Sequence, residues 1–185
     1  KIKILIYPPI RALKNYLDGK IHGYFPALDV RLPKPSNKTS NFYAKRDFIF
    51  FHKDNPKRGL ADLEGQRVGL TFGYAYPKSL SSNKNIEKFF VSSDDQNVKK
   101  LELKRIDAFV VEEMSGLSAI KRTGVKDVTY NPKAVLHAHD VYFAFEKTDL
   151  GAKVTKKFTQ VIESMKKDGT LKNILQPTKN YRFIK

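Results

Sequence analysis

Short apolar segments that alternate with helical segments constrain the fold of this chain more than any other feature of its sequence. The segments expected to form strands are residues 1–7, 21–28, 48–52, 67–71, 106–111, 128–130 and 141–145. The segments expected to be helical are residues 10–17, 60–63, 86–90, 94–104, 113–122, 153–167 and 171–175. Chains in which strands and helices alternate form α/β folds with largely parallel sheets. We therefore predict an α/β fold with mixed, mostly parallel sheets and helices on both faces.

Turn and cap residues mark the ends of several segments. Asp18 and Gly19 supply a stop after the first helical segment. Asp94 or Asp95 is expected to cap the helix that begins there. Residues 29–41 are rich in Pro, Ser, Asn and Lys, which predicts a loop.

Length and composition exclude several classes of protein. A chain of 185 residues is long enough for one ordinary domain or two small lobes. Its 41% hydrophobic and 12% aromatic residues are sufficient for a core, which excludes a disordered chain. No apolar run is long enough to span a membrane, and no secretory leader is visible, so we expect either a cytoplasmic protein or one whose leader is absent from this sequence. Without cysteine, disulfides, thiolate zinc sites and cysteine nucleophiles are excluded.

The basic residues give the chain a formal net charge of 35 − 19 = +16. By count, 27 of them are Lys and only 8 are Arg. Arg is the usual residue for base edges and phosphates, whereas Lys is typical of a solvated surface. The longest lysine runs are pairs inside helical segments, so we expect a solvated basic surface and no nucleic-acid partner. The positive field would steer anionic ligands or an anionic partner surface toward the protein.

Ordered sequence motifs carry a resemblance to a known family. The longest motif runs from Asp62 through the Val-Gly-Leu-Thr segment to Pro77. Further motifs occur in matching order at residues 11–13, 18–23, 105–112, 141–145 and 165–170. Together they cover nearly the whole chain. The chain resembles the bacterial extracellular solute-binding proteins of family 3, the type II periplasmic receptors of polar amino-acid ABC importers.

This resemblance implies a two-lobed, type II periplasmic binding protein-like fold and a function. Lobe one would contain residues 1–52 and 141–185, and lobe two residues 53–140. The lobes would close by a hinge motion on a small polar, carboxylate-bearing, amino acid-like solute in the cleft between them, and the closed form would deliver it to an ABC importer. The alternatives are a ligand-sensing or regulatory domain of the same fold and, less favoured, a periplasmic dehydratase-like enzyme. The resemblance also implies a periplasmic location, with the signal peptide absent from this sequence.

One candidate site follows from the residues themselves. Gly73 ends a strand where a helix is expected to start, and backbone amides at such a start attract anionic groups. Thr71 and Tyr74 flank it with hydroxyls. The alternative is a routine strand–helix turn whose glycine permits the geometry. The resemblance favours a ligand site.

The other candidate ligand residues come from the resemblance. Glu112 occupies the position of the family acid that holds a ligand ammonium, although it could equally be the first acid of a helix N-terminus. Asp29 stands near the position of the family threonine, while Arg31 and Lys34 compete for that of the arginine that clamps the ligand carboxylate. Neither would reproduce the bidentate fork, so a standard α-amino acid is not the predicted ligand. Further ligand contacts, or alternatively core or rim residues, are Tyr7, Arg11, Tyr24 and Phe25.

The sequence departs from the family at its start. Family members begin with a strand and helix that would precede Lys1, a unit of roughly 40 to 50 residues by comparison with a βα unit. Without it, lobe one would expose a sheet edge. We expect either a shortened chain or a variant that pairs through that edge.

Enzymatic and metal sites are not predicted. His137 and His139 alternate on an expected strand, but no carboxylate converges on them in sequence. Glu112 and Glu113 are neighbours whose side chains diverge by about 100° on a helix, which argues against a shared acid–base site. No phosphate-loop or dinucleotide motif occurs. We therefore predict a non-catalytic, monomeric protein without cofactors. Its predicted partners are a small solute, with an anionic solute favoured, and a membrane ABC permease or sensor protein.

Overall fold

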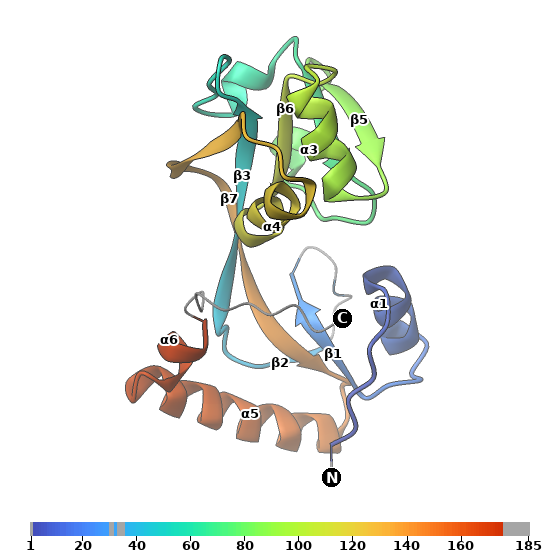
Figure 1. The fold of residues 1–185 in the computed structure, drawn as a ribbon. Helices are drawn as coiled ribbons and strands as arrows, with labels where there is room; N and C mark the ends of the chain where they lie inside the picture. Colours follow the sequence, from blue (N-terminus) through green and yellow to red (C-terminus); the bar gives the residue numbers. More distant parts are fainter. Residues whose placement is uncertain (1, 30–31, 33–35, 176–185) are drawn as a thin grey trace. The chain divides into compact units, whose positions relative to one another are not determined.

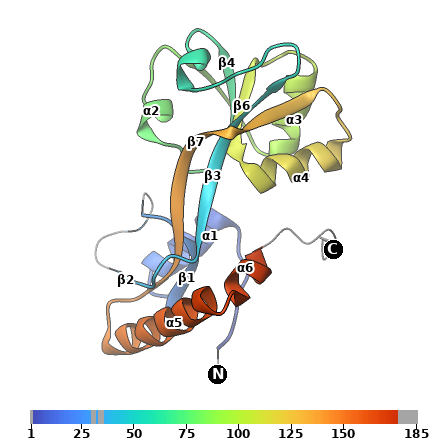
Figure 2. The ribbon, with the colours of Figure 1, turned by 90° about the vertical axis from the view of Figure 1, so that its left-hand side faces the viewer.

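The computed structural model describes residues 2–29, 32 and 36–175, which form two compact units (Figures 1 and 2). Unit 1 consists of Lys1–Ala44 and Asp140–Lys185, and unit 2 of Lys45–His139. The sequence analysis placed the first boundary eight residues later, at 52, because it assigned the apolar strand to lobe one. In the structure this strand is buried in the core of unit 2. No helix among the described residues is both long and apolar enough to cross a membrane.

Unit 2 is built on a mixed sheet. Its strands lie in the order β3 (Tyr43–His52), β6 (Ala108–Glu112), β4 (Arg67–Thr71) and β5 (Glu87–Val91). Strand β4 pairs in parallel with β5 and β6, and β3 pairs antiparallel with β6. The predicted α/β class with a mixed sheet is confirmed, but the sheet is less parallel than predicted: among the pairings described here and below, only those of β4 are parallel, whereas the β3–β6 pair and the pairs formed by the strands of unit 1 are antiparallel.

Alternating side chains cover both faces of the unit 2 sheet. Phe48 and Phe50 of β3 contribute to one apolar cluster, which includes residues of α3 (Asp94–Glu102) and α4 (Glu113–Thr123). Ile49 and Phe51 contribute to the opposite cluster, which includes residues of the 3-10 helix Leu60–Leu63 and of α2 (Lys78–Ser81). This period of two is the pattern of a strand buried on both faces. Helices on both faces, as predicted, therefore complete a layered core.

Glycine allows α4 to approach the sheet closely. A Cβ atom at Gly116 would lie 2.3 Å from the ring of Phe50. Phe50 is fully buried and stacks on Tyr130 with ring centroids 4.9 Å apart, so the ring has little room to move. The absence of a side chain at Gly116 thus sets the distance between helix and sheet.

Unit 1 has a smaller antiparallel sheet. Strands β1 (Gly23–Ala27) and β2 (Asn37–Lys38) both pair with the end of β7 (Val128–Phe145). Tyr142 and Ala144 form a cluster with residues of α1 (Pro9–Leu17). On the other face, Phe158 of α5 (Asp149–Lys167) contacts the rings of Phe143 and Phe145. Figure 2 shows α5 in front of these strands and α1 behind them, and α6 (Thr170–Leu175) follows α5.

Several local predictions differ from the structure. Residues 86–90 were expected to be helical but form the edge strand β5, because each residue from Glu87 to Val91 pairs in register with β4. Residues 2–7, expected to be a strand, have no regular structure, and Ile4 and Ile6 are 83% and 94% exposed. The loop expected at 29–41 contains the two-residue strand β2.

Helix α3 is capped one residue earlier than predicted. The cap is Ser93, whose hydroxyl accepts a hydrogen bond from the amide of Gln96 at 3.4 Å. Asp94 and Asp95 instead occupy the first turn of the helix. Because Asp94 is not needed as the cap, its carboxylate is available for other contacts.

Candidate functional site

Polar residues gather where the parallel strands of unit 2 end. Thr71 is the last residue of β4, α3 begins three residues after β5 ends, and Glu112 is the last residue of β6. The chain leaves β4 toward β5 at one edge of the sheet and leaves β6 through α4 toward β7 on the other side. In open α/β sheets, ligands bind at such a switch point, outside the carboxyl ends of the strands. This end of unit 2 is therefore the candidate functional site.

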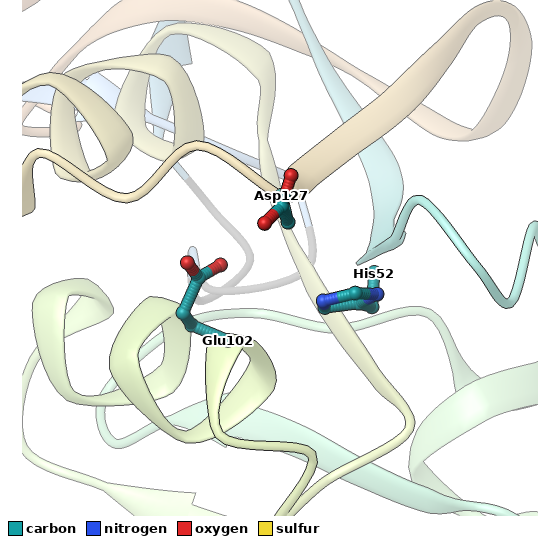
Figure 3. A group of neighbouring side chains, drawn as sticks. All are labelled: His52, Glu102 and Asp127. Atoms are coloured by element: carbon teal, nitrogen blue, oxygen red, sulfur yellow. The ribbon is translucent and has the colours of Figure 1, made fainter.

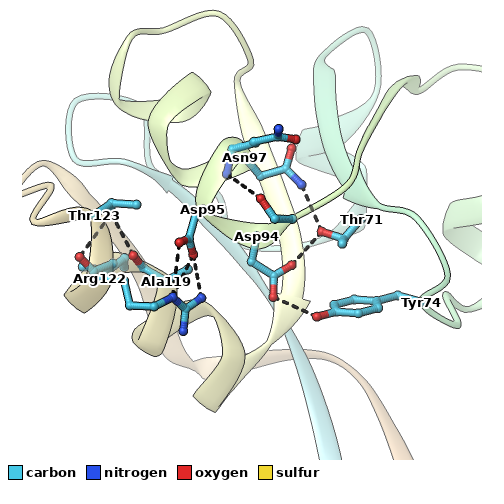
Figure 4. A network of polar contacts seen from close by, with 11 residues as sticks. Thr71, Tyr74, Asp94, Asp95, Asn97, Ala119, Arg122 and Thr123 are labelled. Atoms are coloured by element: carbon cyan, nitrogen blue, oxygen red, sulfur yellow. Dashed lines mark hydrogen bonds and ion pairs between the residues drawn. The ribbon is translucent and has the colours of Figure 1, made fainter. Parts of the chain in front are cut away.

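A buried carboxylate organises this site (Figure 4). Asp94 is 7% exposed and accepts hydrogen bonds from the Thr71 hydroxyl at 2.6 Å and the Tyr74 phenol at 2.9 Å. The Asn97 side-chain amide donates to the same Thr71 hydroxyl at 3.2 Å. We call Thr71, Tyr74, Asp94 and Asn97 the Asp94 network. The two hydroxyls that the sequence analysis assigned to a ligand are thus held in fixed positions by Asp94.

Local electrostatics explain why the Asp94 carboxylate can be buried. Asp94 opens α3, and the positive end of the helix dipole stabilises a negative charge there. Burial, together with the nearby carboxylate, raises the pKa of Tyr74 well above its usual value, so the phenol remains a neutral donor. Burial likewise raises the pKa of Tyr76, whose hydroxyl accepts a hydrogen bond from the Thr71 amide at 2.7 Å. Two tyrosine side chains therefore fix the end of β4.

Gly73 adopts a backbone conformation that favours glycine, with φ of +80°. The helix expected to start directly after it begins instead at Lys78 and contains four residues. Gly73 therefore belongs to the loop between β4 and α2. The alternative interpretation, in which the glycine permits a turn, accounts for this conformation.

Glu112 caps α4. One carboxylate oxygen accepts hydrogen bonds from the amide and the hydroxyl of Ser115, both at 2.9 Å. The side chain is 7% exposed, and its charge contributes to the raised pKa of Tyr74. The helix-terminus interpretation therefore describes its contacts with Ser115, and its ligand role stays a prediction.

A second set of buried charges adjoins the network. Asp47 is 1% exposed, accepts a hydrogen bond from Lys45 at 3.0 Å, and has a carboxylate oxygen 3.6 Å from Nε2 of His139. Lys45 also lies over the Tyr74 ring, 5.6 Å from its centroid. Burial lowers the pKa of His139, which favours its neutral form. The sequence analysis missed this set, although a Lys-Arg-Asp run before an apolar strand is an unusual signal.

The candidate residues of unit 1 form separate groups. Arg11 lies over the ring of Tyr7, 5.6 Å from its centroid, and Arg11 is exposed. Tyr24 is buried and stacks on Tyr16, with centroids 5.9 Å apart. Phe25 is 50% exposed and stacks on Phe143. The structure thus brings Thr71, Gly73, Tyr74 and Glu112 into one region of unit 2, whereas these four unit 1 residues do not form a single cluster.

Asp29 is held by two donors within unit 1. Its carboxylate accepts hydrogen bonds from Lys38 at 2.5 Å and from the Tyr142 hydroxyl at 2.6 Å. The Lys38 contact is the main reason why the pKa of Asp29 lies below its usual value. Arg31 and Lys34, the two candidates for a carboxylate clamp, lie outside the described residues.

Comparison with known proteins supports the resemblance seen in the sequence. No family model matches the chain. A stretch of 130 residues is 29% identical to the probable amino-acid-binding protein YxeM of Bacillus subtilis (strain 168), and it covers 68% of this chain and 48% of that protein. The chain thus spans about half the length of this curated relative.

Solved structures share the fold over most of the chain. An amino acid ABC transporter substrate-binding protein, AbpA from Streptococcus pneumoniae, bound to L-arginine, matches 89% of this chain and 70% of its own, with a TM-score of 0.67 and 16% identity. A histidine kinase sensor domain with similarity to periplasmic binding proteins matches 88% of this chain and 71% of its own, with a TM-score of 0.69 and 18% identity. At such identities the matches establish the fold alone. The predicted resemblance is confirmed: the chain is similar to a curated amino-acid-binding protein and has the α/β fold of amino-acid ABC transporter substrate-binding proteins.

Proposed function

We propose that this chain is a solute-binding protein that captures a small polar, carboxylate-bearing solute and delivers it to a membrane ABC importer. The names of the relatives support this proposal, since one is a probable amino-acid-binding protein and another an amino acid ABC transporter substrate-binding protein. Because the chain spans 48% of the first relative, the activity of a whole receptor is part of the proposal. A periplasmic or extracellular location is proposed on the same basis.

The observation that carries the proposal is the group of buried carboxylates at the switch point of unit 2. Asp47, Asp94 and Glu112 are each at most 7% exposed; Asp94 accepts a hydrogen bond from Tyr74, and Asp47 lies opposite Glu112 where β3 pairs with β6. Buried carboxylates favour a nearby cationic group, and the ammonium of an amino acid-like solute would provide one. We assign the carboxylate of the solute to the basic residues of unit 1, with Arg31 as the preferred partner. The net charge of +16 favours binding of an anionic group.

The contacts of the two adjacent glutamates favour binding without catalysis. Glu112 caps α4, whereas Glu113 binds Arg46 at 2.7 Å and accepts a hydrogen bond from Tyr130 at 2.8 Å. The carboxylates therefore serve separate partners instead of facing one substrate. A general acid–base pair would require both to reach the same reacting group.

A sensory domain of the same fold is the second candidate. The observation in its favour is the similarity to a histidine kinase sensor domain, with a TM-score of 0.69. Both candidates use the same binding chemistry, and they differ in the protein that reads the bound state. Ligand-dependent stimulation of an importer ATPase in proteoliposomes would support the receptor, and ligand-dependent autophosphorylation of a kinase would support the sensor.

The proposal is tested by a thermal-shift screen of amino acids, dicarboxylates and small oxyanions, followed by titration calorimetry. A ligand that binds only the folded chain raises its melting temperature by mass action. Glu112→Gln should weaken binding of an amino acid-like ligand by more than about tenfold, or 1.4 kcal/mol. The matched control Glu113→Gln should leave the affinity unchanged. The proposed hinge closure predicts that bound ligand lowers the radius of gyration in solution scattering.

The outcome of the screen decides the proposal. Selective stabilisation by amino acid-like ligands, lost in Glu112→Gln and kept in Glu113→Gln, supports it. A flat screen, or equal binding by both variants, contradicts the assigned site.

A further inference from the structure

Three potential metal ligands converge on unit 2, away from the residues of the Asp94 network (Figure 3). His52 ends β3, Glu102 ends α3, and Asp127 directly precedes β7. One ligand atom from each residue lies within 4.8 Å of the others. We propose that His52, Glu102 and Asp127 bind a divalent transition-metal ion of the Zn²⁺ class.

The ligand types select this class of ion. An imidazole nitrogen with two carboxylate oxygens suits Zn²⁺ and its first-row neighbours, whereas Ca²⁺ and Mg²⁺ prefer oxygen-only sites. Ligand atoms around a tetrahedral zinc ion lie about 3.4 Å apart, given bonds of roughly 2.0–2.2 Å. The three atoms, within 4.8 Å of one another, therefore need to move inward by only about 1 Å. Rotation of the Glu102 and Asp127 side chains supplies this movement, and solvent can complete the coordination.

A buried carboxylate oxygen points to a ligand at this position. Oε2 of Glu102 is buried, and no hydrogen-bond partner for it occurs among the described residues. An unpartnered buried oxygen of this kind is costly, because the atom has lost water and gained no donor. Figure 3 shows the Glu102 carboxylate turned toward the side chains of His52 and Asp127. A bound cation would provide the missing partner.

The end of α3 adds a favourable electrostatic contribution. Glu102 is the last residue of this helix, where the backbone carbonyls and the helix dipole present partial negative charge. A cation is therefore favoured at this end, just as the Asp94 carboxylate is favoured at the other end of the same helix. The N-terminal end of α3 therefore favours a negative group, and its C-terminal end favours a positive one.

A further carboxylate positions His52. The Asp54 amide donates a hydrogen bond to Nδ1 of His52 at 3.3 Å, and Oδ2 of Asp54 lies 3.4 Å from the same nitrogen. Both contacts are made by Nδ1, so Nε2 is the ring nitrogen that Asp54 leaves available for an ion. His52 also lines a small surface pocket, together with Asp54, Asn55, Lys104, Ile106 and Asp107.

Two lysines compete with the ion, but their contacts are weak. Lys53 lies 3.5 Å from Asp127, with both side chains more than half exposed, and Lys104 pairs with Asp54 at 2.9 Å. Exposed pairs of this kind contribute little to stability, because water and salt screen them. Three carboxylates (Asp54, Glu102, Asp127) against two lysines leave a local charge of −1. The immediate surroundings therefore favour a cation despite the positive net charge of the chain.

The test is titration of the full chain with Zn²⁺ after removal of metals with a chelator. We expect one Zn²⁺ bound per chain in calorimetry, a rise in melting temperature, and visible absorption bands when Co²⁺ replaces Zn²⁺. Glu102→Gln and His52→Gln should each weaken binding by at least about tenfold. Glu102→Gln should not lower the melting temperature of the metal-free chain, because Oε2 has no partner to lose among the described residues and the amide carries no buried charge.

Two further variants make the result decisive. Asp127→Asn removes an exposed ligand without disturbing the core, and it should also lose Zn²⁺ binding. His137→Gln is the matched control, because His137 and His139 form an adjacent histidine pair with centroids 4.1 Å apart. Binding that survives His137→Gln and is lost in the other variants supports the site. Three results would overturn the proposal. The first is the absence of stoichiometric Zn²⁺ binding, the second is binding that survives both Asp127→Asn and Glu102→Gln, and the third is binding that is lost only in His137→Gln.

Discussion

The two units differ most in the polar groups that they bury. In unit 2 the buried polar and charged side chains are Asp47, Lys57, Thr71, Asp94, Asn97, Glu112 and His139. In the described part of unit 1, Thr39 is the only one. Burying polar groups is costly unless each finds a partner, so a fold retains them where geometry or function requires them. The proposed ammonium-binding site therefore lies in the unit that buries more polar side chains.

The apolar packing is also more extensive in unit 2 than in the described part of unit 1. Unit 2 has an apolar cluster on each face of its sheet, whereas the described part of unit 1 has one cluster of five buried residues and an aromatic stack on its other face. Unit 1 also exposes Ile4, Ile6 and Ile10, each by more than 60%. Since stability follows the apolar area removed from water, we expect unit 2 to be the more stable unit. The following predictions test this comparison, and hydrogen exchange can report on each unit separately.

The largest effect is expected from truncating the core of unit 2. Phe50→Ala removes a fully buried ring and should lower the free energy of unfolding of unit 2 by about 3–5 kcal/mol. Phe25→Ala is the matched change in unit 1, where the ring is half exposed, and it should cost about 1 kcal/mol. Urea unfolding combined with hydrogen exchange measures both. Equal losses in the two units would contradict the comparison.

Removing the buried carboxylate of the Asp94 network should have the next largest effect. Asp94→Ala leaves the hydroxyls of Thr71 and Tyr74 without their acceptor and should destabilise unit 2 by about 2–3 kcal/mol. The control is Asp95→Ala, because Asp95 forms a more exposed ion pair with Arg122 at 2.6 Å and should cost less than about 1 kcal/mol. Thermal unfolding of the two variants tests this order, and a reversed order would show that the network contributes little.

A methyl group at Gly116 should produce an intermediate loss. Alanine improves helix propensity by about 1 kcal/mol, but its Cβ would meet the Phe50 ring at 2.3 Å, and overpacking costs about 1–3 kcal/mol. We expect a net destabilisation of about 1–2 kcal/mol in urea unfolding. At Gly59, nothing lies within 4 Å of the position that a Cβ atom would take, so Gly59→Ala should be neutral. Unchanged stability of Gly116→Ala would mean that α4 can move away from the sheet.

The smallest predicted effect is a loss of stability of unit 2 at low pH. Burial lowers the pKa of His139 in the folded chain, with His137 and Lys45 acting in the same direction and Asp47 opposing them. The stability associated with neutral His139 is therefore fully present above the unfolded pKa, near 6.5, and is lost as the pH falls through the lower folded value. Melting curves between about pH 7.5 and 5 should show unit 2 losing stability. His139→Gln should remove this contribution, and the control His22→Gln, at an exposed residue of unit 1, should retain it.

Local sequence patterns predicted most elements of the fold. Apolar runs identified β4 and β6, and helical spacing identified α1, α4 and α5. The pattern failed at β5, where five residues with two adjacent phenylalanines do not distinguish strand from helix. Pairing with β4 decides that conformation, and a nonlocal contact of this kind has no signature within the segment.

The candidate site was predicted only in part for the same reason. Thr71 and Tyr74 belong to a recognisable motif, but Asp94 joins them because β5 lies beside β4, with Val91 paired to Thr71. The metal-binding candidates are separated by 50 and 25 residues along the chain, so they form no motif of fixed spacing. Only the packing of the end of α3 near the end of β3 and the start of β7 brings them together.

The division of the chain into units also has a consequence for its synthesis. Unit 2 is one uninterrupted stretch, Lys45–His139, whereas unit 1 is assembled from both ends of the chain. Strand β1 pairs with residues of β7 that lie about 120 positions later, such as Gly23 with Phe145. During translation, unit 2 can therefore fold as soon as it leaves the ribosome, while β1 must wait for its partner strand. The segment that precedes unit 2 is exposed to chaperones and proteases during that interval, so the yield of folded protein should depend on how quickly residues 140–185 are made.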